Sequence, residues 1–350
     1  MLKHTLIGLA AFAVIGIASG SALAAKPPSG STTGTGRVFV PNPVADLGVG
    51  TFAFRESLTD QKDADFAALQ PAYHEERLTN LNGSGFLSGA FANVYSATGN
   101  LAYSPTNTFD YNRHQDEFEQ VMAYYWITEA QKYIQSLGFG TTFRGINNRP
   151  QNVRIDQWGL DNSFETEHPK FELRFGKGGV DDAEDAEVIL HEYGHAMHVS
   201  QSSTFYSSNE AGSIGEGFAD YWAVTVSDVV SRADGVAVTS DLPCVADWDS
   251  VSYTSTVPHC LRRIDTNAHY PEDLNGEVHH DGKIWSRALW DIRQALGNQV
   301  ADTIILSAQF DFPGTTMADL AQRTVNAAQQ LYGTSAANTV ATAFQARGIL

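Results

Sequence analysis

The sequence predicts an α+β protein with two lobes, and three observations support this fold class. The 350 residues are 43% hydrophobic, enough for one large domain or two lobes with a substantial core. From Arg37 to about Asn100, short apolar runs are broken by Gly, Pro and Asn, whereas the second half carries longer segments with helical spacing. A candidate metal-binding helix lies where the two patterns meet. We therefore expect a β-rich N-terminal lobe over residues 37–200, an α-helical C-terminal lobe over residues 201–350, and a cleft between them.

The first 25 residues are predicted to be a Sec signal peptide. A basic start at Lys3 precedes a largely apolar run from Leu6 to Ile17, and the ALA triplet at 22–24 supplies small residues for cleavage. The run is too short and wrongly flanked for a membrane anchor. We therefore expect the protein to be secreted or periplasmic. The next segment, KPPSGSTTGTG at 26–36, has linker composition and is expected to be flexible.

The cysteine count predicts a disulfide, and the net charge excludes some classes of binding partner. Cys244 and Cys260 are the only cysteines, and an oxidising compartment favours a disulfide between them over two buried free thiols. That bridge would close a loop of roughly 15 residues, worth about 3 kcal/mol in the chain-entropy model. The formal net charge of −18 argues against nucleic acid and anionic membranes as partners.

The remaining elements are predicted from apolar periodicity. Residues 115–137 carry apolar side chains at helical spacing, and their aromatic residues are expected to belong to the core. Strands are expected at NVRIDQW (152–158) and FELRFG (171–176). Further helices are expected at about 183–202, 213–230, 283–296, 300–309, 317–332 and 335–347.

The sequence HEYGH at 191–195 is the first sign of a metal site. Its two histidines lie four residues apart, about one helical turn, so His191 and His195 project from the same face and can share one metal ion. Glu192 lies beside them, where its carboxylate can accept a proton from water. With this composition, chance produces such a pentad in roughly one sequence in fifty, so the motif needs support.

A third metal ligand is predicted on the next helix. A catalytic zinc usually has three protein ligands, and the position six residues beyond His195, where a metzincin has histidine, is Gln201. The segment EAGSIGEGFADYW at 210–222 instead supplies Glu216, with Asp220 four residues later on the same face. The two acids could be a solvated helix face, but the apolar residues around them indicate a buried helix, where unpaired carboxylates are costly.

HEYGH followed by EAGSIGEGFADYW resembles the thermolysin and fungalysin families of zinc metallopeptidases, and GEGFAD is closer to the fungalysin form. The resemblance extends from about Asn152 to the C-terminus. It implies a two-lobed thermolysin-like fold in which Glu216 is the third zinc ligand. It also implies that Asp220 is the carboxylate that holds a zinc-binding histidine, expected to be His191, in the right orientation.

The same resemblance implies groups that stabilise the transition state. EVHHDGKIW at 277–285 resembles the segment from which these families supply a histidine, and the alignment selects His279 rather than His280. Its N–H would stabilise the oxyanion that forms when water attacks a carbonyl. Tyr206, eleven residues after His195, falls where a thermolysin-like enzyme has a tyrosine that assists in oxyanion binding.

Two further residues resemble substrate-binding positions. Asn162 in DNSFE is similar to the asparagine of an edge strand that bonds the substrate backbone. Arg262 in CLRRID is similar to the arginine that binds a substrate carbonyl and supports the site, and Arg263 is the alternative. His198, three residues after His195, matches no role in these families and is expected to lie on the surface.

Calcium is an open alternative as a second cofactor beside one catalytic zinc. Calcium sites are common in the thermolysin family, and Glu187 could be one acid of such a site. Ser227, however, occupies the position where a second acid is expected. The sequence therefore does not clearly reproduce a calcium site.

Taken together, the resemblance implies a secreted zinc endopeptidase, a monomer that hydrolyses protein or peptide substrates with Glu192 as general base. A zinc aminopeptidase is a second hypothesis, but those enzymes have a shorter spacing than that between His195 and Glu216 and carry a GxMxN-like segment that we do not find. A zinc-stabilised binding protein without activity is a third hypothesis. Such a protein would tend to lose Glu192 or His279, and both are present.

Overall fold

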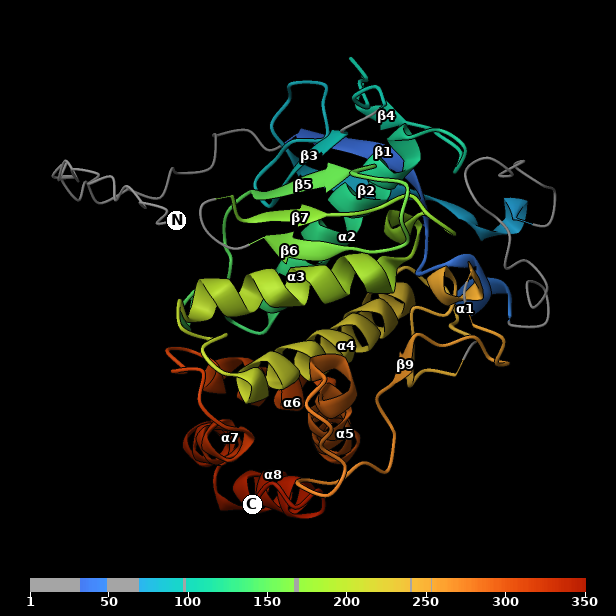
Figure 1. Ribbon diagram of the computed structural model, residues 1–350. Helices are drawn as coiled ribbons and strands as arrows, with labels where there is room; N and C mark the ends of the chain where they lie inside the picture. Colours follow the sequence, from blue (N-terminus) through green and yellow to red (C-terminus); the bar gives the residue numbers. More distant parts are fainter. Residues whose placement is uncertain (1–31, 49–68, 97–98, 167–169, 240, 253) are drawn as a thin grey trace, which may run out of the picture.

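The computed structural model describes residues 32–48, 69–96, 99–166, 170–239, 241–252 and 254–350. The predicted signal peptide lies outside these residues. Strands gather in the N-terminal part of the chain, and the later part consists mostly of helices (Figure 1). The α+β class, with a β-rich first half and a helical second half, is therefore confirmed.

Two sheets build the N-terminal part. In the three-stranded sheet, the central strand β1 pairs antiparallel with β2 and parallel with β4. In the four-stranded sheet, β3, β5 and β7 are parallel, and β6 is an antiparallel edge strand. The strands at NVRIDQW and FELRFG are thus confirmed as β5 and β7. The bounds are β1 (Thr32–Phe39), β2 (Tyr73–Leu81), β3 (Ala92–Ser96), β4 (Thr108–Phe109), β5 (Gln151–Ile155), β6 (Phe164–Thr166) and β7 (Glu172–Arg174).

The expected flexible linker over 26–36 is wrong for residues 32–36, which form the first half of β1. The glycines that suggested a linker are needed for close packing. A Cβ on Gly36 would lie only 2.6 Å from Cγ1 of Val121, and a Cβ on Gly34 would overlap the backbone of Asn107. Composition alone cannot separate a mobile glycine from one that lets two elements approach closely.

The long helix α2 (Glu117–Ser136) forms the centre of the N-terminal core, where the sequence predicted a helix over 115–137. It contacts β1, β3 and the later helix α3 (Ala186–Gln201). Its aromatic side chains, including Phe118, Tyr124 and Trp126, are fully buried, so their predicted place in the core is confirmed.

The six later helices expected from periodicity are all present. Two of them, α4 and α5, begin a full turn or more before the expected residue because a side chain caps each first turn. Ser208 accepts a hydrogen bond from the backbone N–H of Ala211, and Glu277 accepts hydrogen bonds from the first N–H groups of α5. None of the helices within the described ranges has the length and apolar character needed to cross a bilayer. The bounds are α1 (Pro43–Leu47), α3 (Ala186–Gln201), α4 (Asn209–Ala233), α5 (Val278–Leu296), α6 (Asn298–Ala308), α7 (Met317–Tyr332) and α8 (Thr334–Gln345).

Helices α3 and α4 lie between the four-stranded sheet and helices α5 to α8 (Figure 1). Small residues bring α3, α4 and α5 close together. A Cβ on Gly194 of α3 would lie 3.1 Å from the Cα of Ala219 on α4, and a Cβ on Gly217 of α4 would overlap the carbonyl of Gly282 on α5. The predicted metal ligands are therefore carried by helices whose backbones nearly touch.

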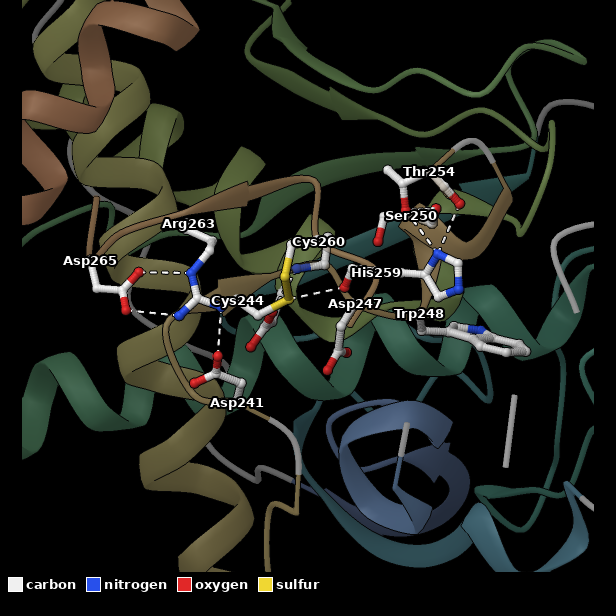
Figure 2. The surroundings of a disulfide bond; sticks show 12 residues. Asp241, Cys244, Asp247, Trp248, Ser250, Thr254, His259, Cys260, Arg263 and Asp265 are labelled. Carbon is white, nitrogen blue, oxygen red and sulfur yellow. Dashed lines mark hydrogen bonds and ion pairs between the residues drawn. A yellow bond between two sulfur atoms is a disulfide. The ribbon is translucent and has the colours of Figure 1, made fainter. Parts of the chain in front are cut away.

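The predicted disulfide between Cys244 and Cys260 is present and joins β8 (Cys244–Val245) to the segment that leads into β9 (Arg262–Arg263). Figure 2 shows the bridge with Arg263 on one side and His259 on the other. The two short strands pair antiparallel. The bridge therefore closes a loop whose two ends both reach the candidate site described next.

Candidate metal centre and active site

The structure brings the three predicted metal ligands together. His191 and His195 lie one turn apart on α3, and their Nε2 atoms are 3.2 Å from each other. The carboxylate of Glu216, on α4, lies 3.3 Å from Nε2 of His191 and 3.6 Å from Nε2 of His195. One ligand atom from each residue falls within 4.8 Å of the others. This spacing allows the three side chains to bind a single ion.

A buried ion pair fixes the orientation of His191. Its Nδ1 lies 2.9 Å from Oδ1 of Asp220, the carboxylate that the resemblance assigned to this purpose. Asp220 also accepts two hydrogen bonds from Arg262, each at 2.7 Å. Burial alone would raise the pKa of Asp220, but Arg262 and His191 outweigh it and lower this pKa to about 2. The ionised carboxylate holds the proton of His191 on Nδ1 and leaves Nε2 free for a metal.

The pKa values of His191 and His195 indicate that the site formed with Glu216 attracts a cation. Burial lowers the pKa of His195 to about 4, so this ring is neutral, the form that binds metals. Burial also opposes the protonation of His191, yet Asp220 and Glu216 raise its pKa to about 10. Two imidazoles and a carboxylate form the donor set of a catalytic zinc site that keeps one position open. The residues present therefore fit a zinc ion.

Glu192 lies beside this centre with the properties of a general base. Its side chain lines the same cavity as His191, Asn162 and His279, although the residue is only 6% exposed. Its Oε2 makes no hydrogen bond to any residue that the structure describes. Burial raises the pKa of Glu192 to about 7, and a nearby dication would lower it again. A carboxylate poised near neutrality can accept and release a proton.

The first turn of α5 places His279, and not His280, at the site. Nε2 of His279 lies 3.4 Å from the carboxylate of Glu216, whereas Nδ1 of His280 faces Asp281 at 3.3 Å. His279 is half exposed, with 49% of its side chain accessible. Oε1 of Glu277 lies 2.6 Å from Nδ1 of His279 and also caps the helix. The sequence did not suggest this orienting role for Glu277, because the helix was expected to begin several residues later.

Tyr206 lies at the site, but its hydroxyl contacts two histidine rings, which is not the contact expected of an oxyanion donor. The hydroxyl lies 2.8 Å from Nδ1 of His195, the ring nitrogen that faces away from the three-ligand cluster. It also lies 3.2 Å from Nδ1 of His198. In this position Tyr206 orients His195, a predicted metal ligand, as Asp220 does for His191.

The expected surface position of His198 is wrong. The residue is 0% exposed, and its ring stacks on that of Phe205 with the centroids 3.8 Å apart. His198 follows His195 by three residues and so continues the helix face that packs against Phe218 of α4. The histidine spacing itself was the signal that could have predicted this burial.

The two predicted substrate-binding residues border the cavity. Asn162 is exposed and precedes the edge strand β6, and it lines the cavity beside Glu192. Of the two arginine alternatives, Arg262 is the one at the site. Arg263 pairs instead with Asp241 and Asp265, beside the disulfide (Figure 2).

Glu187, the acid considered for a calcium site, is buried, and both of its carboxylate oxygens are hydrogen-bonded. One of its carboxylate oxygens accepts a hydrogen bond from Ser227 at 2.8 Å, and the other accepts one from the backbone N–H of Ala246 at 2.7 Å. The serine that replaces the expected second acid thus binds Glu187 directly. Calcium binding stays a prediction.

Comparisons with known proteins relate the fold and the helical part of the chain to metallopeptidases. Residues 203–349 match the family model described as thermolysin metallopeptidase, alpha-helical domain. The structure of the precursor of protealysin, a metalloproteinase from Serratia proteamaculans, is similar with a TM-score of 0.56 and 18% sequence identity, over 86% of this chain and 97% of that chain. No curated protein sequence matches significantly.

The family model covers the part of the chain that supplies Glu216 and His279, and the structural similarity extends over both lobes. At 18% identity the structural similarity establishes the fold alone. The sequence relationship rests on the match of residues 203–349 to the family model. Residues 203–349 thus match the helical domain of the thermolysin metallopeptidases, and this match agrees with the resemblance predicted from the motifs.

Proposed function

We propose that this chain is a secreted zinc-dependent endopeptidase. The observation that carries the proposal is the convergence of His191, His195 and Glu216, with Glu192 beside them in the same cavity. The three ligands would hold one zinc ion. When bound, zinc supplies a Lewis acid that acidifies water and polarises a carbonyl group.

The acid–base chemistry belongs to Glu192. Its carboxylate accepts a proton from the attacking water as the new C–O bond forms at the scissile carbonyl. It then delivers this proton to the leaving nitrogen as the C–N bond breaks. Oε2 of Glu192 has no hydrogen-bond partner within the described residues, which supports both steps because this oxygen is available to take up and release the proton.

His279 stabilises the oxyanion. When both ring nitrogens carry protons, Nδ1–H donates to Glu277 and Nε2–H is available to the developing negative charge. Its half-exposed position on the cavity wall supports this role, since the group must reach substrate. Asn162, next to the edge strand β6, is positioned to bond the substrate backbone.

The remaining polar residues hold the ligands in place. Asp220 and Arg262 fix His191, and Tyr206 fixes His195. The presence of both Glu192 and His279 in the cavity favours an enzyme over an inactive binding protein. Export is supported by the apolar segment in the first 25 residues and by the disulfide.

The test of this proposal is hydrolysis by the purified mature protein. Casein and peptides with acetylated N-termini should both be cleaved internally, a chelator should abolish cleavage, and zinc should restore it. Cleavage of peptides with free N-termini alone would instead favour the aminopeptidase hypothesis. A zinc-loaded protein that cleaves neither casein nor a broad peptide library would refute the proposal.

A further inference from the structure

His198 is a buried polar residue in a largely apolar environment. It follows His195 by three residues on α3 and is 0% exposed. The ring of Phe205 stacks on it with the centroids 3.8 Å apart, and the centroid of the Phe218 ring lies 4.4 Å away. Burial in this environment disfavours the charged form and lowers the pKa of His198 well below its usual value. The ring is therefore neutral, and one of its nitrogens can accept a hydrogen bond.

The hydrogen bonding of His198 is one-sided. Its Nδ1 lies 3.2 Å from the hydroxyl of Tyr206, whereas its Nε2 has no hydrogen-bond partner within the described residues. Leaving a buried polar atom unpaired is costly, and a leucine in the same space would avoid this cost. Packing alone therefore does not account for a histidine at this position, whereas the contact between Nδ1 and Tyr206 does.

The hydroxyl of Tyr206 lies between two histidine rings. It is 2.8 Å from Nδ1 of His195 and 3.2 Å from Nδ1 of His198. Gly215, the residue before Glu216 on α4, leaves the space that the tyrosine ring occupies. A Cβ on Gly215 would lie 2.5 Å from Cε1 of Tyr206 and 3.0 Å from its hydroxyl oxygen. The close approach of this ring to α4 thus places its hydroxyl at both histidines.

The direction of each hydrogen bond follows from the role of His195 as a metal ligand. For Nε2 of this neutral ring to offer its lone pair to a metal ion, the proton must be on Nδ1. Nδ1–H of His195 then donates to the oxygen of Tyr206, and the hydroxyl proton of Tyr206 can be donated to an acceptor. Nδ1 of the neutral His198 ring is an acceptor within reach.

Building on the proposed zinc site, we propose that His198 is a positioning residue for the metal ligand His195 and acts through Tyr206. The hydroxyl of Tyr206 donates to Nδ1 of His198, which turns its oxygen toward Nδ1–H of His195. A fixed acceptor at this position holds the ring plane and the tautomer of His195, with its Nε2 facing Glu216 and His191. His198 therefore contributes to metal affinity without contacting the metal.

The experiment measures zinc affinity for wild type and two variants of His198, by competition with a chromogenic chelator at fixed pH. Leucine fills the apolar space but has no acceptor. His198→Leu should therefore bind zinc about 10-fold more weakly, the lower end of the range for groups that orient a metal-binding histidine, because His198 acts through a neutral tyrosine. Asparagine has a side-chain oxygen close to the position of Nδ1, so His198→Asn should retain most of the affinity.

The melting temperature of the zinc-free variants separates this role from a structural one. Leucine suits the apolar environment better than asparagine, which buries an amide there, so His198→Leu should be the more stable variant. A positioning role thus predicts opposite orders for stability and for zinc affinity. Zinc affinity that follows the melting temperature, with His198→Leu equal to or better than His198→Asn, would refute the inference.

A double-mutant cycle with Tyr206→Phe tests the path of the effect. Phenylalanine keeps the ring but removes the hydroxyl that joins the two histidines, so Tyr206→Phe should itself lower zinc affinity. In this background His198→Leu should cause little further loss, because the group through which His198 acts is already absent. Losses that add fully in the double variant would contradict the proposed path.

The matched control is Gln201→Leu on the same helix. Gln201 is 1% exposed, and its side-chain amide donates to the carbonyl oxygen of Leu306 on α6. This variant also replaces a buried polar side chain by leucine, so it should change the melting temperature but leave zinc affinity unchanged. An equal loss of zinc affinity in Gln201→Leu would show a general response of α3 to substitution and would overturn the inference.

These outcomes separate the inference from the proposed function, because zinc affinity is measured without substrate. A protein that binds zinc, loses affinity in His198→Leu and cleaves no peptide supports the role of His198 and refutes the endopeptidase. Unchanged zinc affinity in His198→Leu, in a protein whose wild type cleaves casein, refutes the role of His198 alone. A wild-type protein that binds no zinc refutes both.

Discussion

Replacement of Asp220 by asparagine should weaken zinc binding without removing any metal ligand. Asparagine keeps the shape of the side chain but loses the negative charge that faces His191 at 2.9 Å and Arg262 at 2.7 Å. It would therefore no longer fix the tautomer of His191 by charge, and the guanidinium of Arg262 would lose its ionic partner. The metal ligands themselves would stay in the chain.

The expected size of the effect follows from comparable orienting groups. Loss of a carboxylate that holds a metal-binding histidine typically lowers metal affinity about 10- to 100-fold, which corresponds to about 1.4–2.7 kcal/mol. The measurement is zinc affinity by competition with a chromogenic chelator at fixed pH. Peptidase activity at saturating zinc is recorded in parallel.

A matched control lies on the same helix. Asp228, two turns after Asp220 on α4, also pairs with an arginine, Arg293, at 2.7 Å. Asp228→Asn should lower the melting temperature, because it too breaks an ion pair with little solvent exposure, yet it should leave zinc affinity unchanged. Equal zinc affinity of Asp220→Asn and wild type would refute the argument. Equal weakening by Asp228→Asn would show a general effect of destabilisation.

Three further predictions concern stability and catalysis. Glu119 is buried, and neither of its carboxylate oxygens has a hydrogen-bond partner in the described part of the chain. Burial first, and then nearby carboxylates, raise its pKa well above 4.5. The folded state thus retains a proton that the unfolded state releases, and stability is lost as the pH rises above 4.5. Glu119→Gln should therefore increase the unfolding free energy at neutral pH by about 1–3 kcal/mol, with a smaller gain at pH 4. Replacing Cys244 and Cys260 by serine should cost about 3 kcal/mol of stability. Glu277→Gln should lower kcat more than it raises KM, because the carboxylate orients His279 at 2.6 Å.

Each of these predictions has a result that contradicts it. Denaturant titrations at several pH values that show Glu119→Gln to be less stable than wild type at pH 8 would mean that its charge has a partner. A double-serine variant as stable as the oxidised protein would show that the bridge does not constrain the unfolded chain. For Glu277→Gln, unchanged kcat in a folded, zinc-loaded protein would exclude the orienting role.

Residues linked by short spacings could be predicted from the sequence. A separation of four residues on a helix places His191 beside His195, and places Glu216 one turn before Asp220, whatever the rest of the fold does. The helical lobe followed from periodicity for the same reason. His279 could be selected over His280 because the motif fixed its position relative to Gly282.

Residues that depend on tertiary packing could not be predicted in this way. Asp161, Asp182 and Asp249 come from three separate segments, and only the folded chain brings them to one cavity. The burial of His198 depends on the packing of α3 against α4. Gly36 resembled a linker residue because composition contains no information on the close approach of Val121.

The most direct test of the central claim is a comparison of wild type with Glu192→Gln, in which both peptide hydrolysis and zinc content are measured. The account predicts about one zinc per chain in both proteins, as expected for a single catalytic site, and hydrolysis by the wild type alone. Glutamine fills the same space but cannot accept the proton of water. A zinc-loaded Glu192→Gln protein that cleaves casein at the wild-type rate would contradict the proposed mechanism.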